Sequence, residues 1–260
     1  MTGVILDERK HAMDALAGNT LGAKPRETVI CLVKYYRDEG YKKSDAANTI
    51  LDFIQGVDRR INIRMWEPVV DRDIKKYWKK PTTILSDIPI TQKEIDIVKT
   101  LPSLRYRRLM FSMICFAKFA DMAEGVRYGW INRKFSQVFQ LGNVHICVKE
   151  QCDMLYNLKE RGLLSFPKKV GNLNTKVECL DYDGEPVMRV TELADVGLQY
   201  DFIEDPSKFR QCEVCGRNIL KNGKASRVKY CPQCAKKANS ERWHDRYMVS
   251  KTQSFSVTNM

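Results

Sequence analysis

Four cysteines near the C-terminus have the spacing of a metal site. Two Cys-x-x-Cys pairs, Cys212 with Cys215 and Cys231 with Cys234, are separated by fifteen residues. Two thiolates at this spacing can bind one metal ion, and four soft sulfur ligands in a tetrahedral arrangement suit Zn²⁺. The interval between the pairs is within the range of a zinc ribbon or a treble clef. The sequence therefore predicts a zinc site, with a disulfide pair or four unconnected thiols as alternatives.

Residues beside the cysteines indicate how the site would be built. Gly216 suits a tight turn after Cys215, and Pro232 suits the first turn of a helix that would carry the second pair. A second pair on a helix favours a treble clef over a ribbon. Four protein ligands leave no open position on the ion, so we expect its role to be structural and not catalytic.

Positive charge is concentrated in the same part of the chain. The 260 residues carry a formal net charge of +12. From residue 206 to the end there are 12 lysines and arginines against three acids, whereas residues 1–205 have 32 against 29. A surface this basic attracts polyanions, so the pattern predicts binding of nucleic acid, with DNA favoured over RNA.

The predicted nucleic-acid contacts are the basic side chains around the cysteines. They are Lys221, Lys224, Arg227, Lys229, Lys236, Lys237, Arg242 and Arg246. Arg242 and Arg246 are four residues apart and would share one face of a helix. We expect Trp243 to pack over the zinc site, with base stacking as its alternative role.

The segment from residue 91 to 200 has the pattern of a winged helix-turn-helix. It opens with a capping box, Thr91-x-x-Glu94. Helices are expected over residues 103–124, 133–139 and 148–161, followed by a strand-like LLSF, a turn and a strand-like TKVECL. This order of helices and strands is typical of a winged helix.

The surface charges of this domain indicate nucleic-acid binding less clearly than its order of helices and strands does. Its turn offers Lys168, Lys169 and Lys176 as phosphate contacts, but the outward charges of the helix at 148–161 nearly cancel. Winged helices also serve as protein-docking and dimerisation folds. A host protein complex or a second copy of the chain is therefore an alternative partner for this domain.

Residues 1–90 are expected to be helical with a linker. A short helix from Asp7 is followed by one that starts at Pro25 and ends before Gly40, and Ser44 is expected to cap the next. This hairpin suits a core-building or docking unit, with direct nucleic-acid contact as the alternative. Residues 56–90 are interpreted as a linker with some helix around 71–78.

The predicted fold class is therefore mainly α, with a helical N-terminal region, a winged-helix middle domain and a four-cysteine zinc module at residues 206–260. No apolar run is long enough for a membrane span and no signal peptide is apparent, so we expect a cytoplasmic protein. The other five cysteines lie in apolar-patterned segments and are expected to be small buried residues, consistent with a reducing compartment.

Enzymatic signatures are missing from the sequence. It has three histidines, no glycine-rich phosphate loop, no Gly-x-Ser-x-Gly and no paired carboxylates at a recognisable spacing. A His-Asn-His nuclease also uses a treble clef, but it needs a His at the hairpin and another His or Asn on the helix to hold a second metal ion. His244 stands alone in that region, so we expect a protein that is not an enzyme.

The stretch from Gly129 to Leu180, GWINRKFSQ to VECL, followed by the four-cysteine module, resembles uncharacterised proteins of phages and mobile elements from Firmicutes. The resemblance implies a cytoplasmic, phage-encoded or prophage-encoded protein and carries no activity with it. The segment DEGYKKSDA also resembles helical segments of primase-like replication proteins. We therefore expect a nucleic-acid-binding protein with a regulatory, replication or recombination role; a phage effector that binds a host defence nuclease or polymerase is the alternative.

Overall fold

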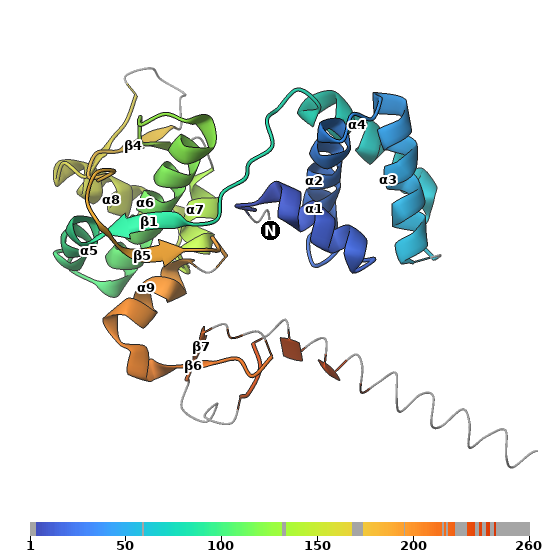
Figure 1. Ribbon diagram of the computed structural model, residues 1–260. Helices are drawn as coiled ribbons and strands as arrows, with labels where there is room; N and C mark the ends of the chain where they lie inside the picture. The colour runs from blue at the N-terminus through green and yellow to red at the C-terminus, as the bar shows by residue number, and fades with distance from the viewer. Residues whose placement is uncertain are drawn as a thin grey trace, which may run out of the picture. The chain divides into compact units, whose positions relative to one another are not determined.

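The computed structural model describes residues 4–58, 60–131, 134–167, 174–194, 196–214, 216, 218–221, 228–231, 234–235, 238–239 and 242. The chain divides into two compact units, residues 1–197 and 198–260. The described residues are mainly helical with small antiparallel sheets, in agreement with the predicted class (Figure 1). Across these ranges no helix is both long and apolar enough to cross a membrane. The finer division into 1–90, 91–200 and 206–260 stays a prediction.

The N-terminal part of the chain folds as helices around one apolar core. The elements are α1 (Glu8–Ala17), α2 (Pro25–Asp38), α3 (Lys43–Val57), the 3-10 helix η1 (Ile63–Met65) and α4 (Glu67–Tyr77). Apolar residues spaced three or four apart on each helix meet in this core, among them Val29, Leu32, Ile50, Ile54 and Ile74. The core therefore joins all the α-helices of this region.

The helical hairpin expected after Pro25 is present as α2 and α3. Pro25 occupies the first position of α2, where its missing N–H costs no hydrogen bond. The predicted cap at Ser44 is wrong. The N-cap of α3 is Lys42, two residues earlier, and the Ser44 hydroxyl lies within hydrogen-bonding distance of the Asp45 carboxylate (3.1 Å). A serine inside the first turn cannot accept from the N–H groups that an N-cap satisfies.

The helix expected around residues 71–78 is present as α4, which begins earlier, at Glu67, and takes up part of the interval interpreted as a linker. Val70 and Ile74 of this helix are buried in the N-terminal core. Asp73 is buried as well and accepts hydrogen bonds from the Arg26 guanidinium at 3.1 and 3.3 Å. Because the buried carboxylate is paired, it is compatible with a packed position. Helix α4 is therefore a structural member of the N-terminal region.

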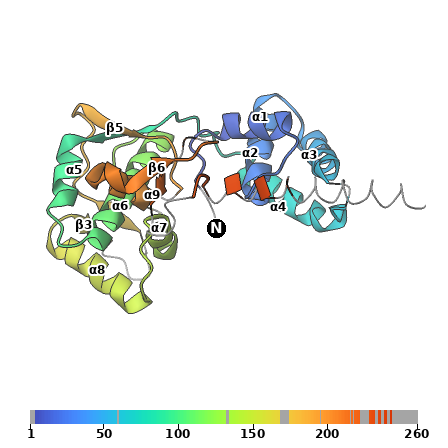
Figure 2. The same ribbon diagram turned by 90° about the horizontal axis from the view of Figure 1, so that it is seen from below.

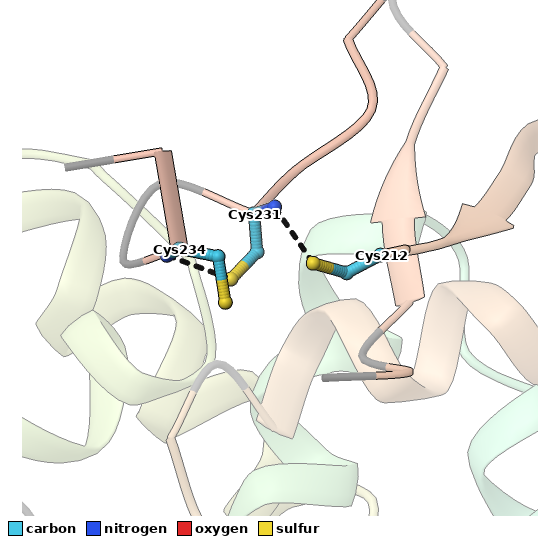
Figure 3. A group of neighbouring side chains, drawn as sticks. All are labelled: Cys212, Cys231 and Cys234. Atoms are coloured by element: carbon cyan, nitrogen blue, oxygen red, sulfur yellow. Dashed lines mark hydrogen bonds between the residues drawn. The ribbon is translucent and has the colours of Figure 1, made fainter. Parts of the chain in front are cut away.

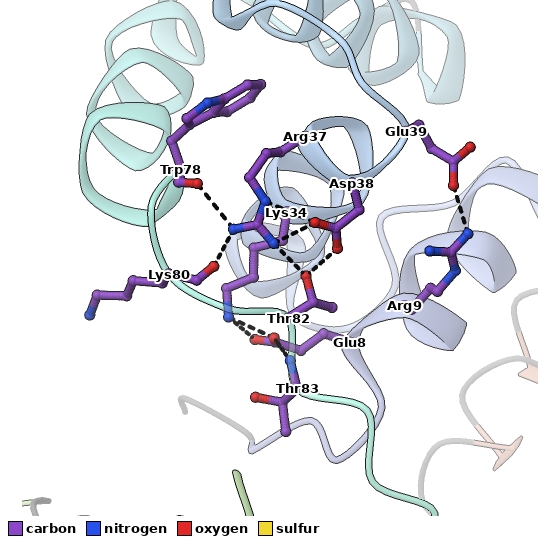
Figure 4. Close-up of polar contacts among 10 residues, drawn as sticks. All are labelled: Glu8, Arg9, Lys34, Arg37, Asp38, Glu39, Trp78, Lys80, Thr82 and Thr83. Carbon is purple, nitrogen blue, oxygen red and sulfur yellow. Dashed lines mark hydrogen bonds and ion pairs between the residues drawn. The ribbon is translucent and has the colours of Figure 1, made fainter. Parts of the chain in front are cut away.

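Polar contacts fasten the chain that leaves α4 to α1 and α2 (Figure 4). The Lys34 ammonium donates to both Glu8 carboxylate oxygens at 2.6 and 2.7 Å, and Glu8 also accepts from the backbone N–H of Thr83 at 2.7 Å. The Arg37 guanidinium donates to the carbonyl of Trp78 at 3.0 Å. Charged partners make such hydrogen bonds stronger than neutral ones. The C-terminal end of α4 is therefore held in a defined place.

The middle of the chain combines helices with two small sheets. Its elements are β1 (Ile88–Thr91), α5 (Gln92–Lys99), α6 (Leu104–Glu124), β2 (Trp130–Ile131), α7 (Phe135–Leu141), α8 (Val148–Glu160), β3 (Leu164–Ser165), β4 (Thr175–Val177) and β5 (Pro186–Val190). Strands β1 and β5 pair antiparallel, and β2, β4 and β3 form a second antiparallel sheet in that order. Helix α6 is buried along most of its length, and Figure 2 shows α8 along the outer edge of this region.

The expected long helix, the expected helix at 148 and the two expected strands are all present near their predicted positions. Strands β1, β2 and β5 were not predicted. Gly129 shows why β2 is tied to its partner strand: its φ is +72°, and a Cβ there would lie 2.7 Å from the carbonyl oxygen of Val177. Only glycine allows this approach of β2 to β4.

A buried ion pair lies at the centre of the middle region. Lys118 of α6 and Glu94 of α5 are almost completely buried, and their charged atoms are 2.7 Å apart. The Lys118 ammonium also donates to the carbonyl of Pro89 at 2.8 Å. Glu94 accepts from the backbone N–H groups of Thr91 (2.9 Å) and Asp181 (3.0 Å). The Thr91–Glu94 capping box is confirmed, and its carboxylate also joins α6 and the segment before β5.

Replacing Lys118 with Met should lower the free energy of unfolding by about 3 to 5 kcal/mol, because Glu94 would keep a buried charge without its cation. Adding Glu94→Gln to that variant should recover part of the loss. Urea unfolding followed by circular dichroism measures both effects, and the exposed Lys99→Met on α5 is the matched control. Equal unfolding curves for K118M and K99M would contradict the structural role of the pair.

Candidate metal centre

The C-terminal unit is built from α9 (Val196–Glu204), the 3-10 helix η2 (Pro206–Lys208), β6 (Phe209–Gln211) and β7 (Asn218–Leu220). Strands β6 and β7 pair antiparallel, with Gln211 opposite Asn218. Phe209 is buried and packs edge-to-face against Phe202, with ring centroids 5.7 Å apart. The turn of this hairpin therefore lies between residues 211 and 218.

The first of the four cysteines, Cys212, lies where the turn of this hairpin begins. Cys212 directly follows β6. Gly216 has a φ of +68°, and its N–H donates to the carbonyl of Cys212 at 2.9 Å. This left-handed glycine is the tight turn expected from the sequence. Cys215, the other predicted ligand of the first pair, lies outside the described residues.

Three of the four predicted ligands come together. The sulfur atoms of Cys212, Cys231 and Cys234 all lie within 4.8 Å of one another. Figure 3 shows Cys212 at the end of β6 facing the segment that carries the other two. Backbone N–H groups point at the sulfurs: that of Cys231 donates to Cys212 Sγ at 3.3 Å, and that of Cys234 donates to Cys231 Sγ at 3.5 Å. These hydrogen bonds orient the sulfur atoms within the cluster.

This thiol cluster could hold a metal ion. A tetrahedral ion about 2.3 Å from each sulfur places neighbouring sulfurs about 3.8 Å apart, which the separations in the cluster accommodate. All three cysteines are free, without a disulfide bond. Cys212 and Cys231 are buried and Cys234 is half-buried, so the cluster is largely shielded from solvent. Three shielded sulfur atoms in close proximity form a suitable donor set for a soft cation.

The second pair lies at the start of a helical stretch, as predicted. The backbone N–H of Ala235 donates to the carbonyl of Cys231 at 2.8 Å, the spacing of a helical turn. The described residues that follow, 234–235, 238–239 and 242, are all helical. Pro232, Trp243 and His244 lie outside the described residues. The arrangement of a hairpin turn followed by a helix agrees with a metal site shared between two segments.

The structure describes only some of the basic residues that were predicted to contact nucleic acid. Arg242 is exposed. Lys229 is exposed and ion-paired with Glu213 at 3.3 Å, and Lys221 donates to the carbonyl of Ser207 at 2.9 Å. The exposed pair is weak, so Lys229 can exchange its partner for a phosphate. Outside the described residues lie Lys168, Lys169, Lys224, Arg227, Lys236, Lys237 and Arg246.

Lys176, which was predicted to contact phosphate from the wing, forms an ion pair within the protein. It lies in β4, and its ammonium is 2.6 Å from Glu178, which also accepts from the hydroxyl of Ser165. This neighbourhood lowers the pKa of Glu178, with the hydrogen bond from Lys176 as the main cause. A phosphate contact by Lys176 therefore requires release from a carboxylate that is charged at neutral pH.

The other five cysteines divide into two groups. Cys31, Cys115 and Cys179 are buried or half-buried, and burial raises the pKa of Cys31 and of Cys179 to about 12 and also raises that of Cys115. These thiols stay protonated at neutral pH and are poor nucleophiles. The expectation of burial is wrong for Cys147 and Cys152, which are exposed at the beginning of α8. The apolar pattern around them belongs to the opposite side of that helix.

A group of exposed cations on α4 was not among the predicted contacts. Arg72, Lys75, Lys76 and Lys79 lie on the side of α4 opposite its buried residues. Their spacing of three and four residues was visible in the sequence. It went unused because this interval was interpreted as a linker.

Comparisons of this chain with models of known protein families, with curated proteins and with solved structures found no match. The resemblance to phage proteins of Firmicutes and to primase-like segments therefore stays a prediction.

The purified protein should carry one equivalent of metal per chain, and Cys234→Ser should lower that content severalfold, whereas Cys152→Ser should not. Elemental analysis of the three proteins measures this. In the metal-bound protein, iodoacetamide should modify Cys147 and Cys152, while the thiol cluster becomes reactive only after a chelator is added. Equal alkylation of the cluster with and without chelator would contradict a metal site.

Proposed function

We propose that this chain is a non-enzymatic nucleic-acid-binding protein whose C-terminal module is held by a structural Zn²⁺. The observation that carries the proposal is the thiol cluster of Cys212, Cys231 and Cys234 inside the most basic segment of the chain. A small module with little apolar core gains its folding energy from the metal. The fold so formed holds lysines and arginines in place for phosphates.

The donor set supports zinc as the ion. Sulfur ligands suit soft or borderline cations, and Cys215 has the spacing of the fourth ligand. A four-sulfur site has no open coordination position for a substrate or an activated water. Zinc would therefore stabilise the module without catalysing a reaction.

The order of elements in the middle region supports the winged-helix interpretation. Helix α6, strand β2, helices α7 and α8, and strands β3 and β4 follow one another, and the sheet order is β2, β4, β3. A winged helix has three helices and a three-stranded sheet, with the wing between the last two strands. In this interpretation α8 would be the recognition helix. This topology favours DNA over RNA as the nucleic acid.

The surface of α8 supports an alternative, a phage effector that binds a host protein complex. Val148 and Tyr156 on this helix have 73% and 58% of their surface exposed, and lysines beside them are balanced by acids. Exposed aromatic side chains on a nearly neutral surface are typical of protein interfaces. In this alternative α8 is the docking surface, and a second copy of the chain is also a possible occupant. A cytoplasmic location in a bacterial host fits both functions.

Binding of the full-length chain to fluorescein-labelled duplex DNA and RNA tests the proposal. With four to six phosphate contacts, log K should fall with log[salt] at a slope of about −4 to −5. Changing Arg242 and Arg246 together to Ala should flatten the slope by about two units. The matched control is Lys42→Gln with Lys43→Gln, which removes two exposed charges near α3.

An unchanged slope in the arginine variant would overturn the assignment of those two residues. Failure of the wild-type chain to bind either nucleic acid near physiological salt would overturn the proposed function. That outcome would favour the protein-docking alternative.

A further inference from the structure

A second basic segment lies far from the cysteines in the sequence. Residues 59–80 contain eight lysines and arginines against three acids, whereas the rest of residues 1–205 contains 24 against 26. The positive charge outside the C-terminal module therefore comes from this one segment. It includes η1, α4 and the residues just after α4.

Helix α4 carries its cations and its buried apolar residues on opposite sides. Val70 and Ile74 face the core, and the cations on the other side are all exposed: Arg72, Lys75, Lys76 and Lys79. Steps of three and four residues put these cations on one face of the helix or its C-terminal end. We call them the α4 basic face. Arg72, Lys75 and Lys76 line a shallow hollow together with Pro68 and Asp71.

The buried acid of this segment, Asp73, has its closest charged partner outside the α4 basic face. Asp73 is buried and receives its hydrogen bonds from Arg26. Arg72 lies 3.7 Å from the same carboxylate, at the limit of an ion pair. In the part of the chain that the structure describes, Lys75 and Lys79 have no ion-pair partner. Their ammonium groups are therefore available to an external anion.

Hydrogen bonds fix the end of the helix that carries these lysines. The Arg37 guanidinium donates to the carbonyls of both Trp78 and Lys80, and it is ion-paired with Asp38 at 2.6 Å (Figure 4). The carbonyls at the helix end are thus held by a cation from α2. Figure 4 shows the Lys80 side chain extending away from this network. A cationic face on a fixed helix binds a polyanion with a smaller loss of conformational entropy than a mobile tail does.

The partner that fits this face is a nucleic-acid backbone. An amphipathic helix that lies in an anionic membrane inserts an apolar face into the lipid. The apolar side of α4 is buried in the N-terminal core, so only its charged side is available. Long, flexible lysine side chains suit a row of phosphates, which they contact as separate point charges.

We propose that the α4 basic face is a second phosphate-binding surface, which contacts the backbone of the nucleic acid independently of the C-terminal zinc module. The inference shares its ligand class with the proposed function but rests on a different region of the chain. The α4 basic face contributes affinity and salt dependence without sequence preference, because backbone contacts do not read bases.

The test uses the full-length chain and a fluorescein-labelled 30-base-pair DNA duplex across a series of salt concentrations. The variant K75Q/K76Q/K79Q removes three exposed charges and no buried group. It should flatten the slope of log K against log[salt] by about two to three units. The matched control K10Q/K42Q/K43Q removes three exposed lysines from the same region and should change the slope by less than one unit. Circular dichroism should show the same helix content for all three proteins.

The outcomes separate this inference from the proposed function. Equal slope changes in the two triple variants would show a general effect of net charge and overturn the α4 surface, while nucleic-acid binding itself would stand. A reduced slope in the α4 variant with no change in R242A/R246A would support the α4 surface and count against the C-terminal contacts. Binding to phosphatidylserine vesicles but not to DNA, lost in the α4 variant, would identify a membrane surface and overturn the proposal.

Discussion

The ion pair between Lys118 and Glu94 is the constraint on which the middle of the structure depends. Two opposite charges are tolerated in an apolar interior only when they are paired and their remaining hydrogen-bonding capacity is satisfied. Here the remaining partners are the backbones at Pro89, Thr91 and Asp181. Because these groups belong to β1, to the start of α5 and to the segment before β5, one buried contact positions several elements around α6. The helices and strands of the proposed winged helix are assembled on that support.

Basic residues are displayed in two physically different ways along this chain. On α4 an apolar face buried in a helical core leaves the opposite, cationic face in solvent. In the C-terminal unit the strands are only three residues long, and the thiol cluster joins the hairpin turn to the helical stretch. Short elements bury too little apolar surface to be stable alone, so a metal crosslink is the natural means of support. On α4 the lysines and the arginine are carried by a helix that is packed into this core.

The middle region complements these basic surfaces. Its α8 has exposed Val148 and Tyr156 among charges that nearly cancel, so it is poorly suited to phosphates and better suited to a protein surface. A division of labour follows from the proposals: the basic surfaces would hold the nucleic acid, and α8 would contact a partner protein or a second copy of the chain. In that case α4 and the C-terminal module would supply most of the electrostatic attraction to the nucleic acid. The middle region would determine the specificity of binding.

The sequence by itself was sufficient for features that depend on short-range rules. The Cys-x-x-Cys spacing, the Thr91–Glu94 capping box, the glycine after Cys215 and the bounds of α6 and α8 all follow from groups within a few residues of one another. The thiol cluster joins residues that are distant in the sequence, but it could still be predicted. Each of the two Cys-x-x-Cys pairs is recognisable by its local spacing as half of one metal site.

Only the tertiary structure decided the rest. Strands β1 and β5 pair across about a hundred residues, and no local pattern announces such a partner. The burial of Asp73 on α4 depends on the Arg26 guanidinium from another helix, which the sequence pattern of α4 does not reveal. Cys147 and Cys152 were expected to be buried because they lie in an apolar-patterned segment. The pattern alone does not show which side of a helix packs against the core. In each case the deciding contact comes from a distant segment, whose position is set by the folded chain and not by the neighbouring residues.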